Sequence, residues 1–215
     1  MGLPSGVMWS PVNIDIEQPG GFAKSPFQYE CTFFSWGNVD GHNPTGPASF
    51  SPWSWGGVNE QDPWYDGQVY GDTPGNTLAT NIPVNSEFDA ARANCGDPWR
   101  MPTSEEFIEL FNNCIYINAD GSEVDTTRVD KRITMNGIVG LRLKSKINGN
   151  VIFFPATGGG NGTSWGSRGI NGGYWSSSWG TARAARDMYF YISGVAPADL
   201  NARFNGFPIR PVMTI

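Results

Sequence analysis

The chain has 215 residues, which is enough to bury one substantial core, so we expect a single domain over residues 1–215. The net charge of −6, with its few basic residues scattered, lacks the positive patch that a phosphate backbone requires and argues against a nucleic-acid partner. No run approaches the ~20 apolar residues of a membrane-spanning helix, so we expect no membrane insertion. The first residues lack the basic and apolar regions of a secretory leader, although removal of an upstream leader stays open.

Composition favours an irregular α+β fold. The 28 glycines, 16 prolines and 9 tryptophans accompany only 16% charged residues, a balance typical of long loops around an aromatic interior. The three cysteines, Cys31, Cys95 and Cys114, are an odd set without metal-ligand spacing, so we expect buried thiols.

Two short helices are predicted. Residues 36–85 are almost entirely turn chemistry, and the first helix follows over 86–94, with Ser86 as its N-cap and Gly96 just past its end. Thr103 to Glu106 reads T-S-E-E, a capping box, before apolar residues at helical spacing from Phe107 to Cys114.

Strand patterns dominate after Cys114. We expect strands at 115–117, 138–143 and 151–154, with Asn148-Gly149 as the turn between the last two, and a flexible loop at 158–162. Within GGYWSSSWGTARAARDMYFYISG, residues 172–194, Met188 and Phe190 fall on one strand face and Asp187, Tyr189 and Tyr191 on the other. Residues 181–186 are predicted as a loop, and 207–212 as an extended segment at a sheet edge.

Four ordered blocks together resemble a known family. They are PWRMPT at 98–103, IFFPA at 152–156, GYWSSS at 173–178 and RFNGFPIRPV at 203–212. The chain resembles the Fibrobacter succinogenes major paralogous domain, common in gut Bacteroidetes and their phages, over roughly residues 3–212. The resemblance implies a C-type lectin-like fold: two short helices, antiparallel sheets and long irregular loops.

The C-terminal part is similar to the variable proteins of diversity-generating retroelements, with a candidate variable cassette at 161–210. In that family an error-prone copy randomises asparagine codons at adenines, which never yields Lys, Glu, Gln, Met or Trp. All 4 lysines, 8 glutamates and 4 glutamines of this chain lie at or before Lys146. A buried sheet also avoids long charged side chains, which is the alternative explanation.

Carried over residue by residue, the resemblance predicts a set of variable positions on a solvent-facing, ligand-binding surface. These positions are Ser167, Ile170, Asn171, Gly180, Thr181, Arg183, Ala184, Ala185, Asp187, Tyr189, Tyr191, Ile192, Ala196, Ala198, Asp199, Leu200, Asn201, Ala202 and Asn205. The fixed inward set would be Trp175, Met188, Phe190, Val195, Phe204 and Phe207, with Arg203 and Arg210 as structural arginines.

Metal and catalytic sites have weaker support. Calcium is one interpretation of the acidic loop that contains Glu60, Asp62, Asp66 and Asp72; a solvated loop is the other, because the spacing is not an EF-hand and the sugar-coordinating triplets of C-type lectins are absent. The single histidine, His42, sits in a turn, where we expect a surface residue and no catalytic set.

The sequence therefore predicts a non-enzymatic binding protein that displays a diversified C-terminal surface to a protein or glycan on a host or neighbouring cell. Its expected location is a phage virion or a bacterial cell surface. The alternatives are a conventional lectin-like module of the same family with a fixed ligand, and a divergent enzyme of the formylglycine-generating type, which shares the broad fold and uses paired cysteines.

Overall fold

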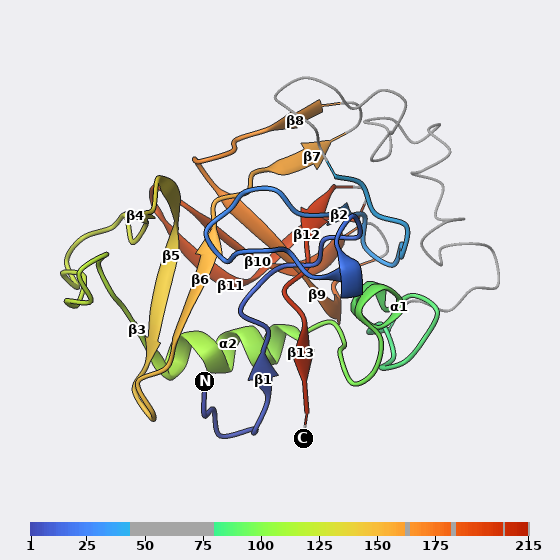
Figure 1. The fold of residues 1–215 in the computed structure, drawn as a ribbon, viewed down its shortest axis with the longest axis horizontal. Coiled ribbons are helices and arrows are strands. Elements are labelled where there is room, and N and C mark those ends of the chain that lie inside the picture. The colour runs from blue at the N-terminus through green and yellow to red at the C-terminus, as the bar shows by residue number, and fades with distance from the viewer. Residues whose placement is uncertain (44–79, 162–163, 182–183, 204, 215) are drawn as a thin grey trace.

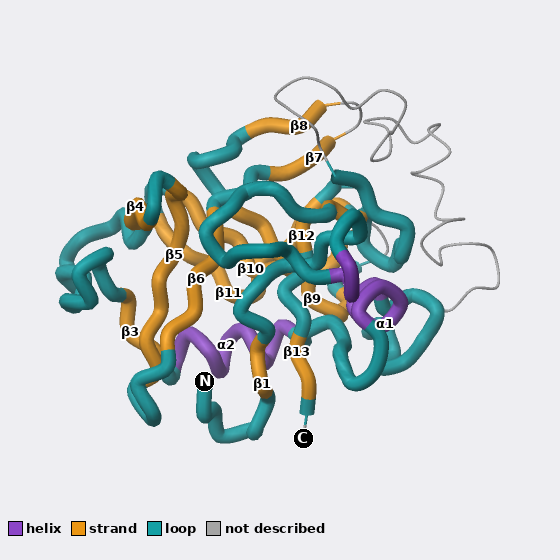
Figure 2. The backbone as a smooth tube through the Cα atoms, in the orientation of Figure 1, coloured by secondary structure: helices purple, strands orange, loops and turns teal. Residues whose placement is uncertain are grey.

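A computed structural model describes residues 1–43, 80–161, 164–181, 184–203 and 205–214 of the chain. These residues form antiparallel sheets and two short α-helices joined by long loops (Figures 1 and 2). The α+β class predicted from composition is consistent with this arrangement. None of the helices in the described ranges is long and apolar enough to cross a membrane.

The two ends of the chain pair with each other. β1 (Met8–Trp9) runs antiparallel to β13 (Val212–Met213), and β2 (Phe33–Phe34) to β12 (Phe207–Pro208). A short 3₁₀ helix, η1 (Pro19–Gly21), lies between β1 and β2. The late chain is thus anchored on the early chain, and N and C lie near each other in Figure 1. The predicted extended segment at 207–212 is confirmed.

The first helix begins later than predicted. α1 spans Ala90–Cys95, and its N-cap is Asp89, whose carboxylate accepts hydrogen bonds from the backbone N–H groups of Ala91 and Arg92 at 3.1 Å. Asp89 takes this role because its short acceptor side chain sits directly before the helical residues, whereas Ser86 forms only the preceding turn. Gly96 ends the helix as expected.

The second helix is confirmed with its capping box. α2 spans Ser104–Asn112, Thr103 Oγ1 accepts from the Glu106 N–H, and the Glu106 carboxylate accepts from the Thr103 N–H. Phe107 and Leu110 are fully buried on one side of α2. The apolar spacing therefore selects the helix face that enters the core.

A four-stranded sheet follows α2. Its strands are β3 (Cys114–Tyr116), β4 (Ile133–Met135), β5 (Ile138–Ser145) and β6 (Val151–Pro155), with β5 pairing to the other three. The predicted β5–β6 hairpin is confirmed, and Gly149 has the positive φ of 76° that its turn requires.

A three-stranded sheet carries the rest of the core. β10 (Ala184–Tyr191) is central, between β9 (Gly172–Trp179) and β11 (Gly194–Ala202). The prediction of a loop over 181–186 was wrong for 184–186, because pairing of Ala184 with Ala202 and of Ala185 with Trp179 extends β10. Cross-strand pairing outweighs the weak local preference of this alanine-rich stretch.

The two faces of this sheet pack on different cores. The face that carries Tyr174, Met188 and Phe190, which we call the Phe190 face, packs against Phe107 and Leu110 of α2. The opposite side, which we call the Trp175 face, carries Trp175, Ala185, Asp187, Tyr189 and Asn201. Its core partners include Phe34 and Trp36 from the N-terminal segment and Phe207 from β12.

Candidate functional site

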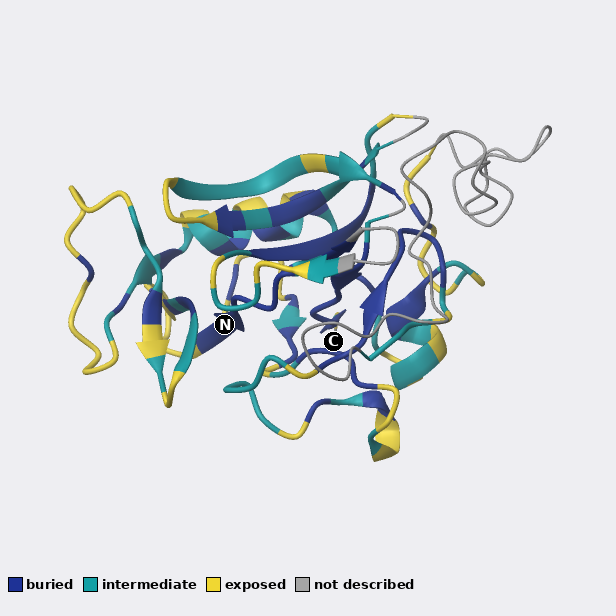
Figure 3. Ribbon diagram, turned by 90° about the horizontal axis from the view of Figure 1, so that it is seen from above, coloured by how far each residue is buried: buried dark blue, intermediate teal, exposed yellow. Residues whose placement is uncertain are grey.

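The Trp175 face is covered at one end and open at the other. Ala185 and Asp187 are completely buried, Tyr189 is half-buried, and Tyr191 is 43% exposed. In Figure 3, β9 is almost entirely dark blue, β10 alternates between buried and half-buried residues, and β11 is mostly teal. The prediction that Ala185 and Asp187 face solvent was therefore wrong. The alternation assigned them to the correct face, but the N-terminal segment covers that end of the face.

A cleft of about 300 Å³ borders the Trp175 face at Tyr189 and Asn201. Its opposite wall is a hairpin of β7 (Gly159–Asn161) and β8 (Ser164–Gly166), so the prediction of a flexible loop over 158–162 was wrong where β7 lies. Among the described residues, the cleft is lined by Gly159, Gly160, Trp165, Gly166, Ser167, Asn171, Tyr189, Asn201, Asn205 and Phe207. The structure thus brings together five predicted variable positions: Ser167, Asn171, Tyr189, Asn201 and Asn205.

The wall formed by β7 lies on Phe207. A Cβ on Gly159 would come within 2.6 Å of the Phe207 ring, and one on Gly173 within 2.8 Å. Only glycine permits such a close approach, so the glycine-rich sequence builds the contact between hairpin and sheet. Phe207 also packs against Trp175, with ring centroids 4.9 Å apart, and this ties the cleft to the core.

Sequence reasoning did not place Trp165 at the site. This side chain is half-buried in the hairpin wall, 6.1 Å from the ring of Phe33 and 5.5 Å from the guanidinium of Arg168. Tryptophan cannot arise from a randomised asparagine codon, so the rule that selected the variable positions excluded it. A lone aromatic residue between glycines and small polar residues was the available signal.

Asp187 lies on β10, next to the strand β11 that carries Asn201. The Asn201 amide donates to both carboxylate oxygens at 3.1 Å, and Asp199 pairs with Asp187 across the strands. Burial raises the pKa of the Asp187 carboxyl to about 8; the Asn201 hydrogen bond opposes this shift, and the Asp199 charge adds to it. The carboxyl is therefore mostly protonated, and uncharged, at neutral pH.

The other predicted variable positions do not line the cleft. Ala184 and Leu200 lie on the sheet side opposite Asp187 and Asn201, and Leu200 is 45% exposed. Ile192 is exposed in the β10–β11 turn, and the Ile170 carbonyl accepts a hydrogen bond from Arg132. Gly180, Ala196, Ala198, Asp199 and Ala202 are half-exposed and Thr181 is exposed. Arg183 lies outside the described residues.

The predicted inward set largely lies in the core. Trp175, Met188, Phe190 and Phe207 are buried, and Val195 packs half-buried against the Phe190-face core; Phe204 lies outside the described residues. Both arginines are structural, as expected. Arg210 is fully buried, bonds to Asn13 and three backbone carbonyls, and stacks on Phe154 at 4.8 Å; Arg203 stacks on Trp36 at 4.7 Å.

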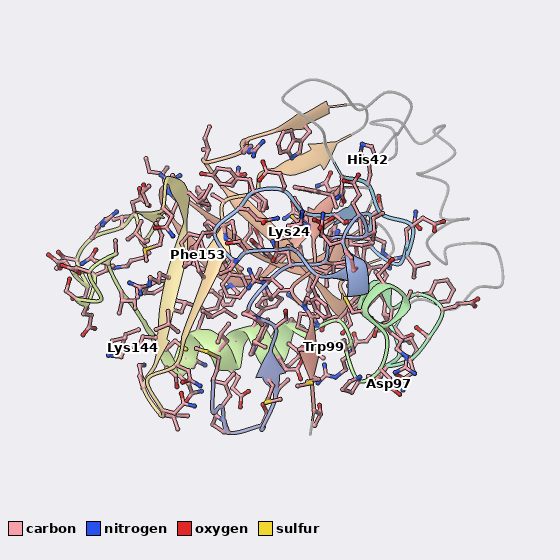
Figure 4. The ribbon with its side chains drawn as sticks, viewed as in Figure 1. Lys24, His42, Asp97, Trp99, Lys144 and Phe153 are labelled. Atoms are coloured by element: carbon pink, nitrogen blue, oxygen red, sulfur yellow. The ribbon has the colours of Figure 1, made fainter. Side chains whose placement is uncertain are left out.

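The expected thiols and histidine do not form a reactive set in the described chain. Cys31 and Cys114 are buried as expected, whereas Cys95 is only half-buried. All three are free, and burial raises the pKa of each thiol, to about 12, 12 and 11. A raised pKa suppresses the thiolate that nucleophilic chemistry needs. His42, which is labelled in Figure 4, is half-buried, and its backbone pairs with that of Phe33 in β2. Burial lowers the pKa of His42 despite the nearby Glu17.

Metal ligands do not cluster within the described ranges. The four acidic candidates, Glu60, Asp62, Asp66 and Asp72, lie outside those ranges. A larger cleft of about 630 Å³ lies beside β4, and two of its charged side chains, Arg132 and Asp130, form an ion pair at 2.8 Å. Among the described residues, no predicted variable position lines that cleft.

Comparison with known proteins adds no relative. No family model, curated protein or solved structure matches this chain. The geometry of the cleft and the pattern of the sequence are thus the grounds for a functional proposal.

Proposed function

We propose that this protein is a non-enzymatic ligand-binding protein of C-type lectin-like fold whose C-terminal segment displays a diversified binding surface. Its ligand is a protein or glycan on a host or neighbouring cell, and the chain belongs on a phage virion or bacterial surface. The observation that carries the proposal is the convergence of Ser167, Asn171, Tyr189, Asn201 and Asn205 around one cleft, although they are spread over 39 residues of sequence.

The surroundings of the cleft support this assignment. Its frame is made of buried residues that the randomisation chemistry leaves unchanged, including Trp175, and of Phe207 fixed between two glycines. The five variable positions are half-buried or exposed, so their side chains can change without emptying the core. A binding protein with a diversified surface needs a fixed core that holds the cleft and lining residues that can be replaced without unfolding that core.

The burial of Ala185 and Asp187 narrows the proposal. A position inside the core cannot accept arbitrary side chains, so these two residues belong to the frame. The binding surface is therefore centred on the cleft and on neighbouring exposed positions such as Tyr191, and it does not extend over the whole Trp175 face.

One pair of variants tests both ligand binding and whether the fold tolerates substitutions in the cleft. A cleft variant replaces Asn171, Tyr189, Asn201 and Asn205 together with Ser. A control variant replaces three exposed residues outside the candidate cassette, Val129, Ile147 and Val151, with Ser. We expect both variants to fold, and only the cleft variant to lose ligands found on arrays of glycans and bacterial surface proteins. An unfolded cleft variant, or unchanged binding by a folded one, would contradict the proposal.

A conventional module with a fixed ligand would pass the same binding test. Sequencing of the gene neighbourhood distinguishes the two. We expect an adenine-rich repeat that matches the codons of 161–210 and a reverse-transcriptase gene beside it. Their absence would favour the fixed-ligand alternative.

A further inference from the structure

The lining of the cleft contains aromatic, amide and hydroxyl groups. Tyr189, Trp165 and Phe207 supply rings, Asn171, Asn201 and Asn205 supply amides, and Ser167 supplies a hydroxyl. No Lys, Arg, Asp or Glu side chain is among the described residues that line it. An ionic ligand would lose water at such a site without gaining a counter-charge, so the cleft favours an uncharged partner.

Nearby charges are engaged elsewhere. Arg168 follows Ser167 in the chain, and its guanidinium pairs with Glu30 and lies 4.9 Å and 5.5 Å from the centres of the Tyr29 and Trp165 rings, so it borders the cleft already paired. Asp187 is buried on the neighbouring strand and accepts both of its side-chain hydrogen bonds from the Asn201 amide. Asp199 is half-exposed on the same sheet face as Asn201, but it is not among the described residues that line the cleft.

Asn205 carries an unmet hydrogen-bonding capacity. Its side-chain oxygen Oδ1 is buried and has no hydrogen-bond partner within the described part of the chain, although the residue lines the cleft. A buried acceptor without a donor is costly, and a ligand hydroxyl placed there would remove that cost. The observation points to a ligand that donates hydrogen bonds.

The size of the cleft suits a small ligand, such as one sugar ring, better than the surface of a partner protein. A volume of about 300 Å³ lies at the lower end of the range for small-molecule sites. Stable protein partners typically cover ~800 Å² on each side, which is a broad surface rather than a small hollow. Tyr189 is half-exposed, with Phe207 behind it at a centroid distance of 6.2 Å, so one supported ring is available for stacking.

We propose that the cleft binds one uncharged sugar residue, free or at the end of a glycan, without calcium. The Tyr189 ring packs against the apolar face of the sugar, and the Asn171, Asn201 and Asn205 amides and the Ser167 hydroxyl exchange hydrogen bonds with its hydroxyl groups. This inference rests on the proposed function, because it names the ligand class of the same site.

Binding of defined sugars by the full chain tests the inference. Saturation-transfer NMR in EDTA would use the methyl glycosides of glucose, galactose, mannose, fucose and N-acetylglucosamine, with sialic acid and glucosamine as charged probes. We expect saturable binding of at least one neutral glycoside and none of the charged probes. A glycan array with the same terminal residues then shows whether the free sugar or the chain end binds more tightly.

Variants connect that binding to the cleft. Tyr189→Ala should weaken it roughly tenfold, as expected for the loss of one stacking contact, and Tyr189→Phe should retain it within about threefold because the ring remains. Asn205→Leu should also weaken it roughly tenfold, since it removes the acceptor. The matched control Leu200→Ala should leave it unchanged, and a thermal melt of each variant verifies folding.

Three results would overturn the inference. They are no binding of any neutral glycoside, binding of the charged probes alone, and sugar binding that Tyr189→Ala and Asn205→Leu leave intact. A protein ligand that occupies the cleft while all sugars fail would also overturn it, yet would leave the proposed function standing. Loss of folding in the four-residue cleft variant would instead count against the proposed function.

Discussion

The covered and open ends of the Trp175 face belong to the same strands but differ in what lies over them. Ala185 and Asp187 are completely buried at one end, whereas Tyr191 is exposed at the other. The covered end contacts Phe34 and Trp36, which come from more than 100 residues earlier in the sequence. Period-two alternation assigns a side chain to a face of a sheet, but distant segments decide whether that face meets water.

The largest contrast between the two ends should be in stability. Trp175→Ala removes a fully buried ring that donates to the Phe34 carbonyl at 2.8 Å and packs on Phe207. We expect a loss of about 3–5 kcal/mol in the free energy of unfolding, because a cavity and an unpaired carbonyl remain. Urea unfolding followed by circular dichroism measures it.

Leu200→Ala is the matched control, since this side chain is half-exposed on the same sheet. We expect a change within about 0.5 kcal/mol, which is typical of surface positions. Similar losses in the two variants would remove the distinction between a fixed frame and an exchangeable surface.

The next effect concerns the buried carboxyl at the covered end. Asp187 has a pKa of about 8 in the folded protein, above its unfolded value of 3.8. Between about pH 4 and pH 8 the folded protein therefore holds one proton on this carboxyl that the unfolded chain has lost. Stability from this group is complete below about pH 4 and falls as pH rises through 8. We expect a loss of roughly 2 kcal/mol between pH 6 and pH 8.

Asp187→Asn should remove most of that slope, because asparagine fills the same space without titrating. Unfolding curves at pH 6, 7 and 8 for both proteins give the comparison. Asp199→Asn is the control; Asp199 is half-exposed, so most of the slope should remain. Equal slopes in wild type and Asp187→Asn would mean that the carboxyl titrates near its ordinary value.

The sequence predicted local structure well where local forces determine it. The capping box at Thr103 and Glu106 and the turn at Gly149 were both found, because the cap groups and the glycine turn act within a few residues. The strand at Ala184 and the β7–β8 hairpin were missed, because Ala184 pairs with Ala202 and β7 lies against Phe207. Ala202 and Phe207 follow their partners Ala184 and Gly159 by 18 and 48 residues. The pairing of β7 with β8 is local, but its glycine-rich sequence carries no period-two apolar pattern.

The sequence predicted several of the residues that line the candidate site, but it did not predict how they are arranged. Five of its lining residues were proposed from the randomisation pattern, while Trp165 was excluded by the same pattern. Ala185 and Asp187 have residue types that the pattern allows, and only their burial removes them from the surface. Residue type alone therefore does not distinguish the residues that line the cleft from the buried residues that support it.

The smallest expected changes in stability come from Tyr189 and Tyr191, and they show which of the two side chains belongs to the buried core. Tyr189 packs on Phe207 and lies 5.9 Å, between ring centroids, from the more exposed Tyr191. Tyr189→Ala should cost about 1–2 kcal/mol, because part of its ring is buried, and Tyr191→Ala should cost under about 0.5 kcal/mol. The double variant measures the coupling between the rings, which we expect at about 0.5 kcal/mol. A larger cost for Tyr191 than for Tyr189 would place the edge of the core beyond the β10–β11 turn, and the surface proposed for binding would then be part of the frame.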